Sequence, residues 1–276
     1  MSELKDYYPE HEIKSLAYIS INYLLNMSKS DTIINANKII GVSVLQNFFS
    51  TISDLKKYKP IQYIFSETNF YNNKFFCSNK SLIPRCETEE LVDWIINDNK
   101  YTVKKYLDIC TGGGCIIISL CKNLKGTFNG VDISLDALSI AKKNNYRNKT
   151  NVIFNKIDIL DYNARSLLSK FNNKYDVIVS NPPYVLNSEK KQMNKNVLQW
   201  EPHLALFVDD DDPFIFYKTI ENTAKKILNY DGTLYFEINE RFGNEIILLL
   251  EKEGYVNIEL KKDINDKDRM IKASWK

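Results

Sequence analysis

The sequence predicts an α/β protein with a parallel sheet, preceded by a small helical domain. Three observations support this: strand and helix patterns alternate from Lys104 onward, only helical periodicity is present up to about Tyr58, and the texture changes between Pro60 and Pro84. Alternating strands and helices produce a parallel sheet covered on both faces. We therefore expect a helical bundle over 1–59, a linker over 60–84 and a larger domain over 85–276.

The first region is predicted to be helical by the spacing of its apolar side chains. They recur at three- and four-residue steps from Ile13 to Met27, as one buried helix face requires. The same spacing from Ile39 to Ile52 indicates a second and a third helix. In the linker, Asn72-Asn73 separates two short aromatic runs, and asparagine tolerates the left-handed conformation of tight turns. This pattern predicts a β-hairpin.

The larger domain contains apolar, β-rich runs that end in polar or small residues, namely 104–110, 126–133, 151–158, 175–183 and 233–239. Helical patterns accompany them at 114–124, 134–148, 213–229 and 242–253. Two last runs, 255–263 and 269–275, have no helix between them. We expect these two to form a terminal antiparallel pair.

Composition narrows the classes of protein to be considered. The chain has 276 residues, and its 37 Lys and Arg nearly balance 35 Asp and Glu, so we do not directly expect a nucleic-acid partner. No stretch has 18 consecutive apolar residues, and the N-terminus does not resemble a signal peptide. The five cysteines form no C-x-x-C pair, which indicates free thiols and no metal site. We expect a soluble, cytoplasmic protein without a membrane partner.

A nucleoside site is predicted where three consecutive strands end. The run from Asp108 through Thr111 to Gly112 and Gly114 follows the first strand and opens a helix, so its backbone can approach a ligand closely. Asp132 closes the next strand and can accept both hydroxyls of a ribose. Asp158 closes the third and is placed to reach an adenine amino group.

Other interpretations of these residues stay open. The glycine run can be a tight strand–helix turn, and Asp132 can be a helix cap before Ser134. NAD is the rival ligand, but its G-x-G-x-x-G fingerprint requires glycine at position 117, which is isoleucine. This favours a cofactor without a pyrophosphate.

The catalytic candidate is Asn181-Pro182-Pro183-Tyr184, directly after a predicted strand. Two prolines cannot donate to the sheet ladder, so the strand stops there and the backbone is stiff. The Asn181 side chain and the Pro182 carbonyl can then accept the hydrogens of a planar NH2 group, with the Tyr184 ring against its plane. An amide nitrogen is a poor nucleophile, and two aligned acceptors favour charge build-up on it. We therefore predict methylation of an amide or amino nitrogen.

The sequence resembles amino-methyltransferases that carry a (D/N)-P-P-(Y/F) motif after the fourth strand. Within them it is similar to the peptide chain release factor N5-glutamine methyltransferases (HemK/PrmC-type family). The segments that carry this resemblance run from about Pro60 to the C-terminus: KPIQYIFSETNFY (59–71), SLIPRCETEELVDW (81–94), EPHLALF (201–207) and KDINDKDRMIKA (262–273).

The resemblance implies a class I seven-stranded, Rossmann-like domain that uses S-adenosyl-L-methionine and releases S-adenosyl-L-homocysteine. It implies that the substrate is the glutamine of the Gly-Gly-Gln loop in peptide chain release factors, gripped by the N-terminal bundle. Asp132 would hold the ribose, the glycine loop the methionine moiety, and Asn181 with Pro182 the glutamine amide. The wall of the site would include Arg85, Glu87 and Thr88.

The chain departs from the family pattern at Cys110, Gly113, Cys86 and Asn239, where glycine, serine, proline and glycine are usual. We expect tolerance at Cys110, and a looser turn at Gly113. Two alternatives remain: a DNA or RNA amino-methyltransferase acting on adenine N6 or cytosine N4, and a non-catalytic nucleotide-binding protein. His203 is interpreted as a wall or packing residue, because the proposed reaction needs no strong base.

Overall fold

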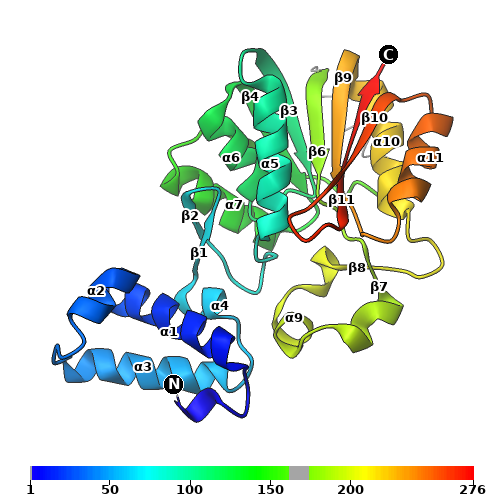
Figure 1. Cartoon of the computed structure of the whole chain (residues 1–276). Coiled ribbons are helices and arrows are strands. Elements are labelled where there is room, and N and C mark those ends of the chain that lie inside the picture. Colours follow the sequence, from blue (N-terminus) through cyan, green and yellow to red (C-terminus); the bar gives the residue numbers. More distant parts are fainter. Residues whose placement is uncertain (1, 162–173) are drawn as a thin grey trace. The chain divides into compact units, whose positions relative to one another are not determined.

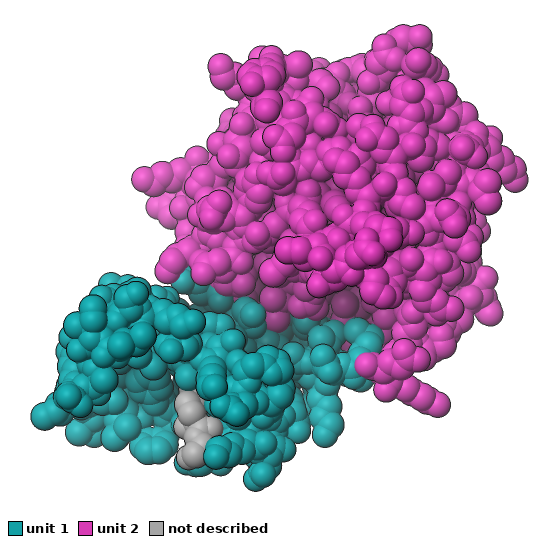
Figure 2. Space-filling model, in the orientation of Figure 1, with its two compact units in different colours: residues 1–67, 193–201 teal, residues 68–192, 202–276 magenta. Residues whose placement is uncertain are grey.

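The computed structural model describes residues 2–161 and 174–276, in which helices come first and a mixed sheet follows (Figure 1). The chain divides into two units. Unit 1 contains residues 1–67 and 193–201, and unit 2 contains residues 68–192 and 202–276 (Figure 2). The second piece of unit 1 was not expected, because a nine-residue segment so far along the chain carries no pattern that assigns it to the bundle.

Unit 1 is helical. Its apolar core contains Leu16, Leu55 and Phe65. The prediction of two helices between Ile39 and Ile52 was wrong: one helix begins after Gly41, and Ile39 precedes it with 95% of its surface exposed. The elements are η1 (Ser2–Leu4), α1 (Glu10–Leu25), α2 (Lys29–Ile34), α3 (Val42–Leu55), α4 (Ile61–Phe65) and α9 (Lys195–Trp200).

The returning segment of unit 1 is held by polar and aromatic contacts within that unit. The Trp200 indole Nε1 donates to the Lys57 carbonyl oxygen at 3.1 Å. The Lys195 ammonium lies 4.9 Å from the centre of the Tyr58 ring, and the Lys59 ammonium lies 5.8 Å from the Trp200 ring. Cations over aromatic faces attract the ring quadrupole. The segment is therefore attached to the bundle by specific contacts.

The predicted hairpin is present as β1 (Glu67–Phe70) and β2 (Asn73–Phe76), which form a two-stranded sheet. The two residues between the strands, Tyr71 and Asn72, have φ of 43° and 59°. Tight hairpin turns with positive φ at both central positions match the twist of the strands. The turn lies one residue earlier than the asparagine pair.

Unit 2 contains the predicted seven-stranded sheet, in the order β10-β11-β9-β6-β3-β4-β5. Neighbours from β9 to β5 are parallel, whereas β11 is antiparallel to both β9 and β10, as predicted for the terminal pair. The short strands β7 (Val185–Leu186) and β8 (Phe207–Val208) pair separately. The sheet strands are β3 (Val103–Ile109), β4 (Lys125–Asp132), β5 (Ile153–Lys156), β6 (Tyr175–Ser180), β9 (Leu228–Glu237), β10 (Val256–Lys262) and β11 (Asp268–Trp275).

Helices cover both faces of the sheet (Figure 1). Successive strand residues point to opposite faces, so Tyr106 and Val177 pack into one apolar cluster, and Leu107 and Ile178 into the other. The first face carries α5 (Cys86–Asn99), α6 (Cys115–Asn123) and α7 (Leu135–Arg147), and the second carries α10 (Ile215–Ile227) and α11 (Gly243–Lys252). Two 3₁₀ turns complete the described elements, η2 (Asn187–Gln192) and η3 (His203–Ala205).

Helix α5 was not predicted, because its segment was interpreted only through the motif that it carries. Nothing among the described helices is both long and apolar enough to cross a membrane. The parallel strands place the ends of β3, β4, β5 and β6 at one edge of the sheet. Polar side chains that follow these strands are therefore brought together.

Candidate active site

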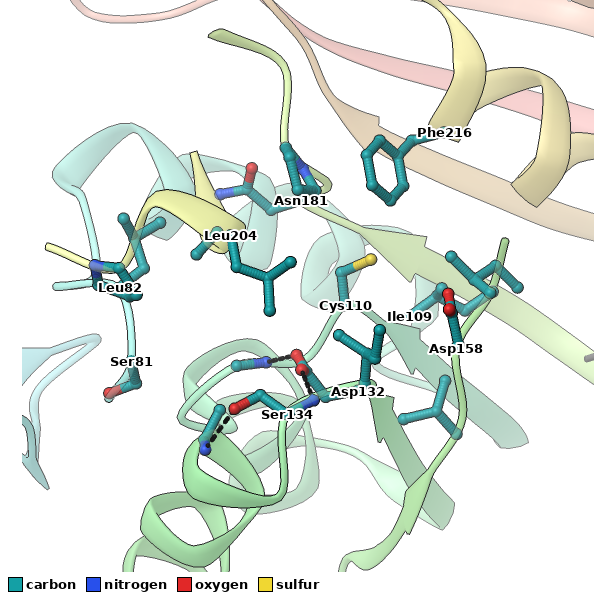
Figure 3. Close-up of a pocket in the computed structure, with 18 of the residues that line it drawn as sticks. Ser81, Leu82, Ile109, Cys110, Asp132, Ser134, Asp158, Asn181, Leu204 and Phe216 are labelled. Atoms are coloured by element: carbon teal, nitrogen blue, oxygen red, sulfur yellow. Dashed lines mark hydrogen bonds between the residues drawn. The ribbon is translucent and has the colours of Figure 1, made fainter. Parts of the chain in front are cut away.

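A cavity of about 170 Å³ lies at the carboxyl ends of the parallel strands (Figure 3). Five predicted site residues line it: Gly112, Asp132, Asp158, Asn181 and Pro183. Seven others are not among its lining residues, namely Asp108, Thr111, Gly114, Pro182, Tyr184, Arg85 and Glu87. The remaining walls come from 80–82, 109–110, 131, 133–134, 137, 157, 159–160, 202, 204–205 and 216.

Asp132 ends β4 and has its carboxylate fixed by two backbone donors. One oxygen accepts from the Gly112 N–H and the other from the Ser134 N–H, each at 2.8 Å (Figure 3). Burial raises the pKa of this carboxyl, and the N–H donors oppose that rise. Ser134 itself caps α7 by accepting from the Ala137 N–H at 3.1 Å. Asp132 is therefore not the cap, and each of its oxygens retains acceptor capacity toward a ligand.

Much of the cavity lining is apolar. Val131 of β4, Ala137 of α7, and Ile157 and Ile159 after β5 belong to it. Asp158 belongs to the same lining, and its Oδ1 accepts from the Leu160 N–H at 2.9 Å. A mostly apolar lining with a few placed polar groups is the usual composition of a small-molecule site.

The glycine loop takes backbone conformations that side chains disfavour. Gly112 and Gly114 have φ of 54° and 80°, and a Cβ on Gly114 would lie 3.0 Å from the Ile118 side chain. Cys110 has φ of 62°. This left-handed value agrees with the expectation of glycine at that position, because a Cβ is strained there. Cys110 lines the cavity between Asn181 and Asp132 (Figure 3), and burial raises the pKa of its thiol well above the ordinary value.

Asp108 holds the start of the glycine loop through Thr111. It is 1% exposed, and Thr111 Oγ1 donates to its Oδ2 at 2.6 Å. Burial raises its pKa to about 7, and the nearby Asp132 adds to the rise. The sequence analysis missed a second support, the fully buried Asn144 on α7, which donates to the Gly113 carbonyl at 2.9 Å and accepts from the Phe76 N–H at 2.6 Å. An asparagine on the buried face of a predicted helix was the available signal.

The Asn-Pro-Pro-Tyr turn begins where β6 ends at Ser180, as the two prolines require. Ser180 Oγ donates to the Ile109 carbonyl at 2.6 Å, which joins the ends of β6 and β3. Pro182 and Pro183 are buried. Asn181 faces the cavity on the side away from Asp132 (Figure 3). The turn thus holds Asn181 in a rigid backbone at the edge of the cavity.

A buried carboxylate that the sequence analysis did not select stands behind this turn. Glu237, at the end of β9, is 1% exposed and accepts from Thr88 Oγ1 at 2.6 Å and from the Tyr184 hydroxyl at 3.0 Å. Burial raises its pKa, whereas those two donors and the charge of Arg269 lower it. Asn181 Nδ2 in turn donates to Thr88 Oγ1 at 3.4 Å. The available signal was its place at a strand end, like that of Asp132.

Arg85 and Glu87 lie at the start of α5, near this network. Burial raises the pKa of Tyr184, and the charge of Arg85 opposes that rise, whereas the charge of Glu87 adds to the rise that burial causes at Glu237. His203 is exposed in η3, and its ring lies edge-on to Phe207 at 5.1 Å. It is not among the lining residues.

The seven-stranded sheet, with a site at its strand ends and an Asn-Pro-Pro-Tyr turn, defines a methyltransferase. The family model "Methyltransferase small domain" matches residues 88–201. A solved methyltransferase from Pyrococcus furiosus has the same fold, with a TM-score of 0.52 at 15% identity over 83% of this chain and 98% of that one.

Two curated relatives narrow the class. A release factor glutamine methyltransferase of Flavobacterium psychrophilum is 43% identical over 99% of this chain and 95% of its own length. One from Bacteroides thetaiotaomicron is 40% identical over 98% of this chain and 96% of its own length. The chain belongs to the release factor glutamine methyltransferase family.

Proposed function

We propose that this protein transfers a methyl group from S-adenosyl-L-methionine to the side-chain nitrogen of the glutamine in the Gly-Gly-Gln loop of peptide chain release factors. One observation carries the proposal: Asn181, on its proline-stiffened turn, lines the same cavity as Asp132. Methyl transfer requires that the nitrogen to be methylated and the nucleoside-containing methyl donor bind in one cavity, close to each other.

The residues present fit S-adenosyl-L-methionine. Asp132 has both oxygens oriented by backbone N–H groups, so their remaining lone pairs are available to two ribose hydroxyls. The apolar wall and Asp158 suit adenine and its amino group. Gly112 lines the cavity with its backbone, which suits the methionine moiety. When bound, the cofactor supplies an electrophilic methyl group on a sulfonium.

The protein's task is to orient and activate the amide nitrogen. Asn181 Oδ1 and the Pro182 carbonyl accept its two N–H hydrogens, which favours positive charge on the nitrogen as the new bond forms. Tyr184, the last residue of the turn, donates its hydroxyl hydrogen to Glu237. A well-held near-attack geometry contributes roughly 7–11 kcal/mol in favourable systems. The methylated nitrogen is cationic, and its surplus proton is acidic enough to pass to solvent water, so no strong base is required.

The protein substrate is proposed to dock on unit 1. Several large apolar side chains are exposed on its helices and on the segment between α2 and α3, among them Ile34, Ile39, Val42 and Phe49. Such exposed apolar surface on a small unit is available for contact with a protein partner. The five cysteines are free thiols, which fits work in the reducing cytoplasm, where release factors act.

The proposal is tested by incubating the protein with labelled S-adenosyl-L-methionine and a purified release factor, then locating the added mass by peptide mass spectrometry. We expect one methyl group on the glutamine of the Gly-Gly-Gln loop. Labelling of DNA or RNA in place of the release factor would overturn the proposal.

We call the two proposed acceptors of the amide hydrogens, Asn181 Oδ1 and the Pro182 carbonyl, the acceptor clamp, and Asn181→Ala tests it. We predict that kcat falls by at least about 100-fold, because the nitrogen loses an oriented acceptor, while cofactor affinity changes little. Asn123→Ala is the matched control, since among the described residues its side chain donates to the Ser119 carbonyl, one turn earlier in α6. Undiminished methyl transfer by Asn181→Ala would refute the clamp.

A further inference from the structure

Thr88, Glu237 and Asn181 form a buried chain of hydrogen bonds with a fixed direction. Thr88 Oγ1 lies between the Glu237 carboxylate, 2.6 Å away, and Asn181 Nδ2, 3.4 Å away. Thr88 and Glu237 are 4% and 1% exposed, and neither is among the residues that line the cavity. The chain therefore approaches Asn181 from behind the wall of the site.

The direction follows from the chemistry of the end group. Thr88 Oγ1 donates to Glu237 Oε2, so the single hydroxyl hydrogen of Thr88 is committed to that carboxylate oxygen. The Thr88 oxygen can then act toward Asn181 only as an acceptor. The second Glu237 oxygen accepts from the Tyr184 hydroxyl at 3.0 Å, and Arg269 supplies a positive charge nearby. Both carboxylate oxygens are thus engaged as acceptors.

The Asn181 side chain is symmetric in shape, because an amide oxygen and an amide NH2 group occupy nearly the same space. Turned by half a rotation, it would place Oδ1 against a hydroxyl whose hydrogen is already used. Two acceptors facing each other in a buried site are unfavourable. Only the orientation with Nδ2 toward Thr88 is compatible with the chain.

We propose that Glu237 and Thr88 are positioning residues that fix the amide orientation of Asn181, so that its oxygen and not its NH2 group is presented to the substrate nitrogen. This rests on the proposed function, in which Asn181 accepts an N–H hydrogen of glutamine. In the wrong orientation Asn181 would offer hydrogen-bond donors to an NH2 group and would disfavour the transition state. We call these hydrogen bonds from Glu237 through Thr88 to Asn181 the relay. The relay acts on catalysis through Asn181, without touching either ligand.

The test replaces the carboxylate by its neutral isostere. Glu237→Gln can donate to Thr88 as well as accept from it, so both orientations of Asn181 become compatible. We expect kcat for methylation of a release factor to fall about tenfold, a loss equivalent to that of one hydrogen bond in the transition state. The affinity for S-adenosyl-L-methionine, measured by calorimetry, should stay within about twofold of that of the parent. Thr88→Val should lower kcat similarly, and Thr88→Ser, which keeps the hydroxyl, should restore it.

Two further variants separate the relay from packing. The double variant Thr88→Val with Glu237→Gln should be no slower than either single variant, since both substitutions interrupt the same series of hydrogen bonds. Tyr217→Phe removes a buried hydroxyl that donates to the Glu237 backbone carbonyl at 3.3 Å, and it should leave kcat unchanged. Additive losses in the double variant, or an equal loss in Tyr217→Phe, would overturn the relay.

The relay and the clamp fail in different ways. If Asn181→Ala abolishes methyl transfer while Glu237→Gln and Thr88→Val keep the parent kcat, the relay is wrong and the clamp stands. If Asn181→Ala is fully active, the clamp itself is wrong. Should Glu237→Gln fold poorly by circular dichroism, the comparison of Thr88→Val with Thr88→Ser decides the question.

Discussion

Replacing Asp132 by alanine tests the nucleoside site most directly. In the parent protein its carboxylate accepts the Gly112 and Ser134 N–H groups at 2.8 Å each, which orients both oxygens toward the cavity they line. Alanine removes the acceptor that we assign to the ribose hydroxyls. A hydrogen bond to a charged group contributes about 1.5–3 kcal/mol, so cofactor affinity should fall roughly 10- to 150-fold.

Asp132→Ala should reduce the stability of the protein less than it reduces the cofactor affinity. Gly112 and Ser134, whose N–H groups lose their acceptor, are only half-buried, so we expect the free energy of unfolding of the ligand-free protein to fall by only about 1 kcal/mol. Asp132→Asn should be no milder than alanine. Its amide has one oxygen for two converging N–H donors, so its NH2 group would face one of them.

Isothermal titration calorimetry with S-adenosyl-L-methionine and S-adenosyl-L-homocysteine measures the affinity, and urea denaturation without ligand measures the stability. Unchanged affinity for both ligands in Asp132→Ala would refute the assignment of the ribose site. A loss of affinity matched by an equally large loss of stability would show that Asp132 acts only by holding the loop.

Two other predictions concern the glycine loop and Asp108. Gly113→Ser should raise the free energy of unfolding by about 0.4–1 kcal/mol, because a Cβ there meets nothing closer than 3.5 Å and the unfolded chain loses conformational freedom. Gly114→Ser should be destabilising, because Gly114 has a positive φ and crowded surroundings. Urea denaturation compares the two variants, and a Gly113→Ser variant less stable than the parent would contradict the prediction. Asp108 has its pKa raised to about 7 in the folded state, so the folded state binds a proton more tightly and stability falls as pH rises from 3.8 to about 7. This decline, at most about 1.4 kcal/mol per pH unit, should be reduced in Asp108→Asn, and identical pH profiles of the two proteins would refute it.

Much of the fold was predictable because its signals are local. Each parallel strand is an apolar run that ends in a polar residue, and the same pattern that predicted the strands placed Asp132, Asp158 and Asn181 at one edge of the sheet. Those residues line one cavity, as their positions at strand ends imply. The prediction of two helices around Gly41 was wrong, because the exposed Ile39 and the half-buried Ile40 extended the apolar spacing beyond the start of α3.

The parts that could not be predicted depend on contacts between distant segments. Thr88 and Glu237 are 149 positions apart, and no local pattern indicates that they meet. Asn144 resembles any helical asparagine until its bonds to the glycine loop and to β2 are seen. The strain at Cys110 is likewise a property of the backbone, which its residue type does not reveal.

The returning segment at 193–201 has a consequence for dividing this protein into parts. It follows the Asn-Pro-Pro-Tyr turn in sequence and precedes Pro202, which lines the cavity, yet its Trp200 is bonded to the Lys57 carbonyl. A single cut near residue 60 would therefore remove the Lys57 carbonyl that accepts from Trp200, and would leave Trp200 attached to unit 2. A hybrid with another family member's helices should transplant both stretches as a matched set.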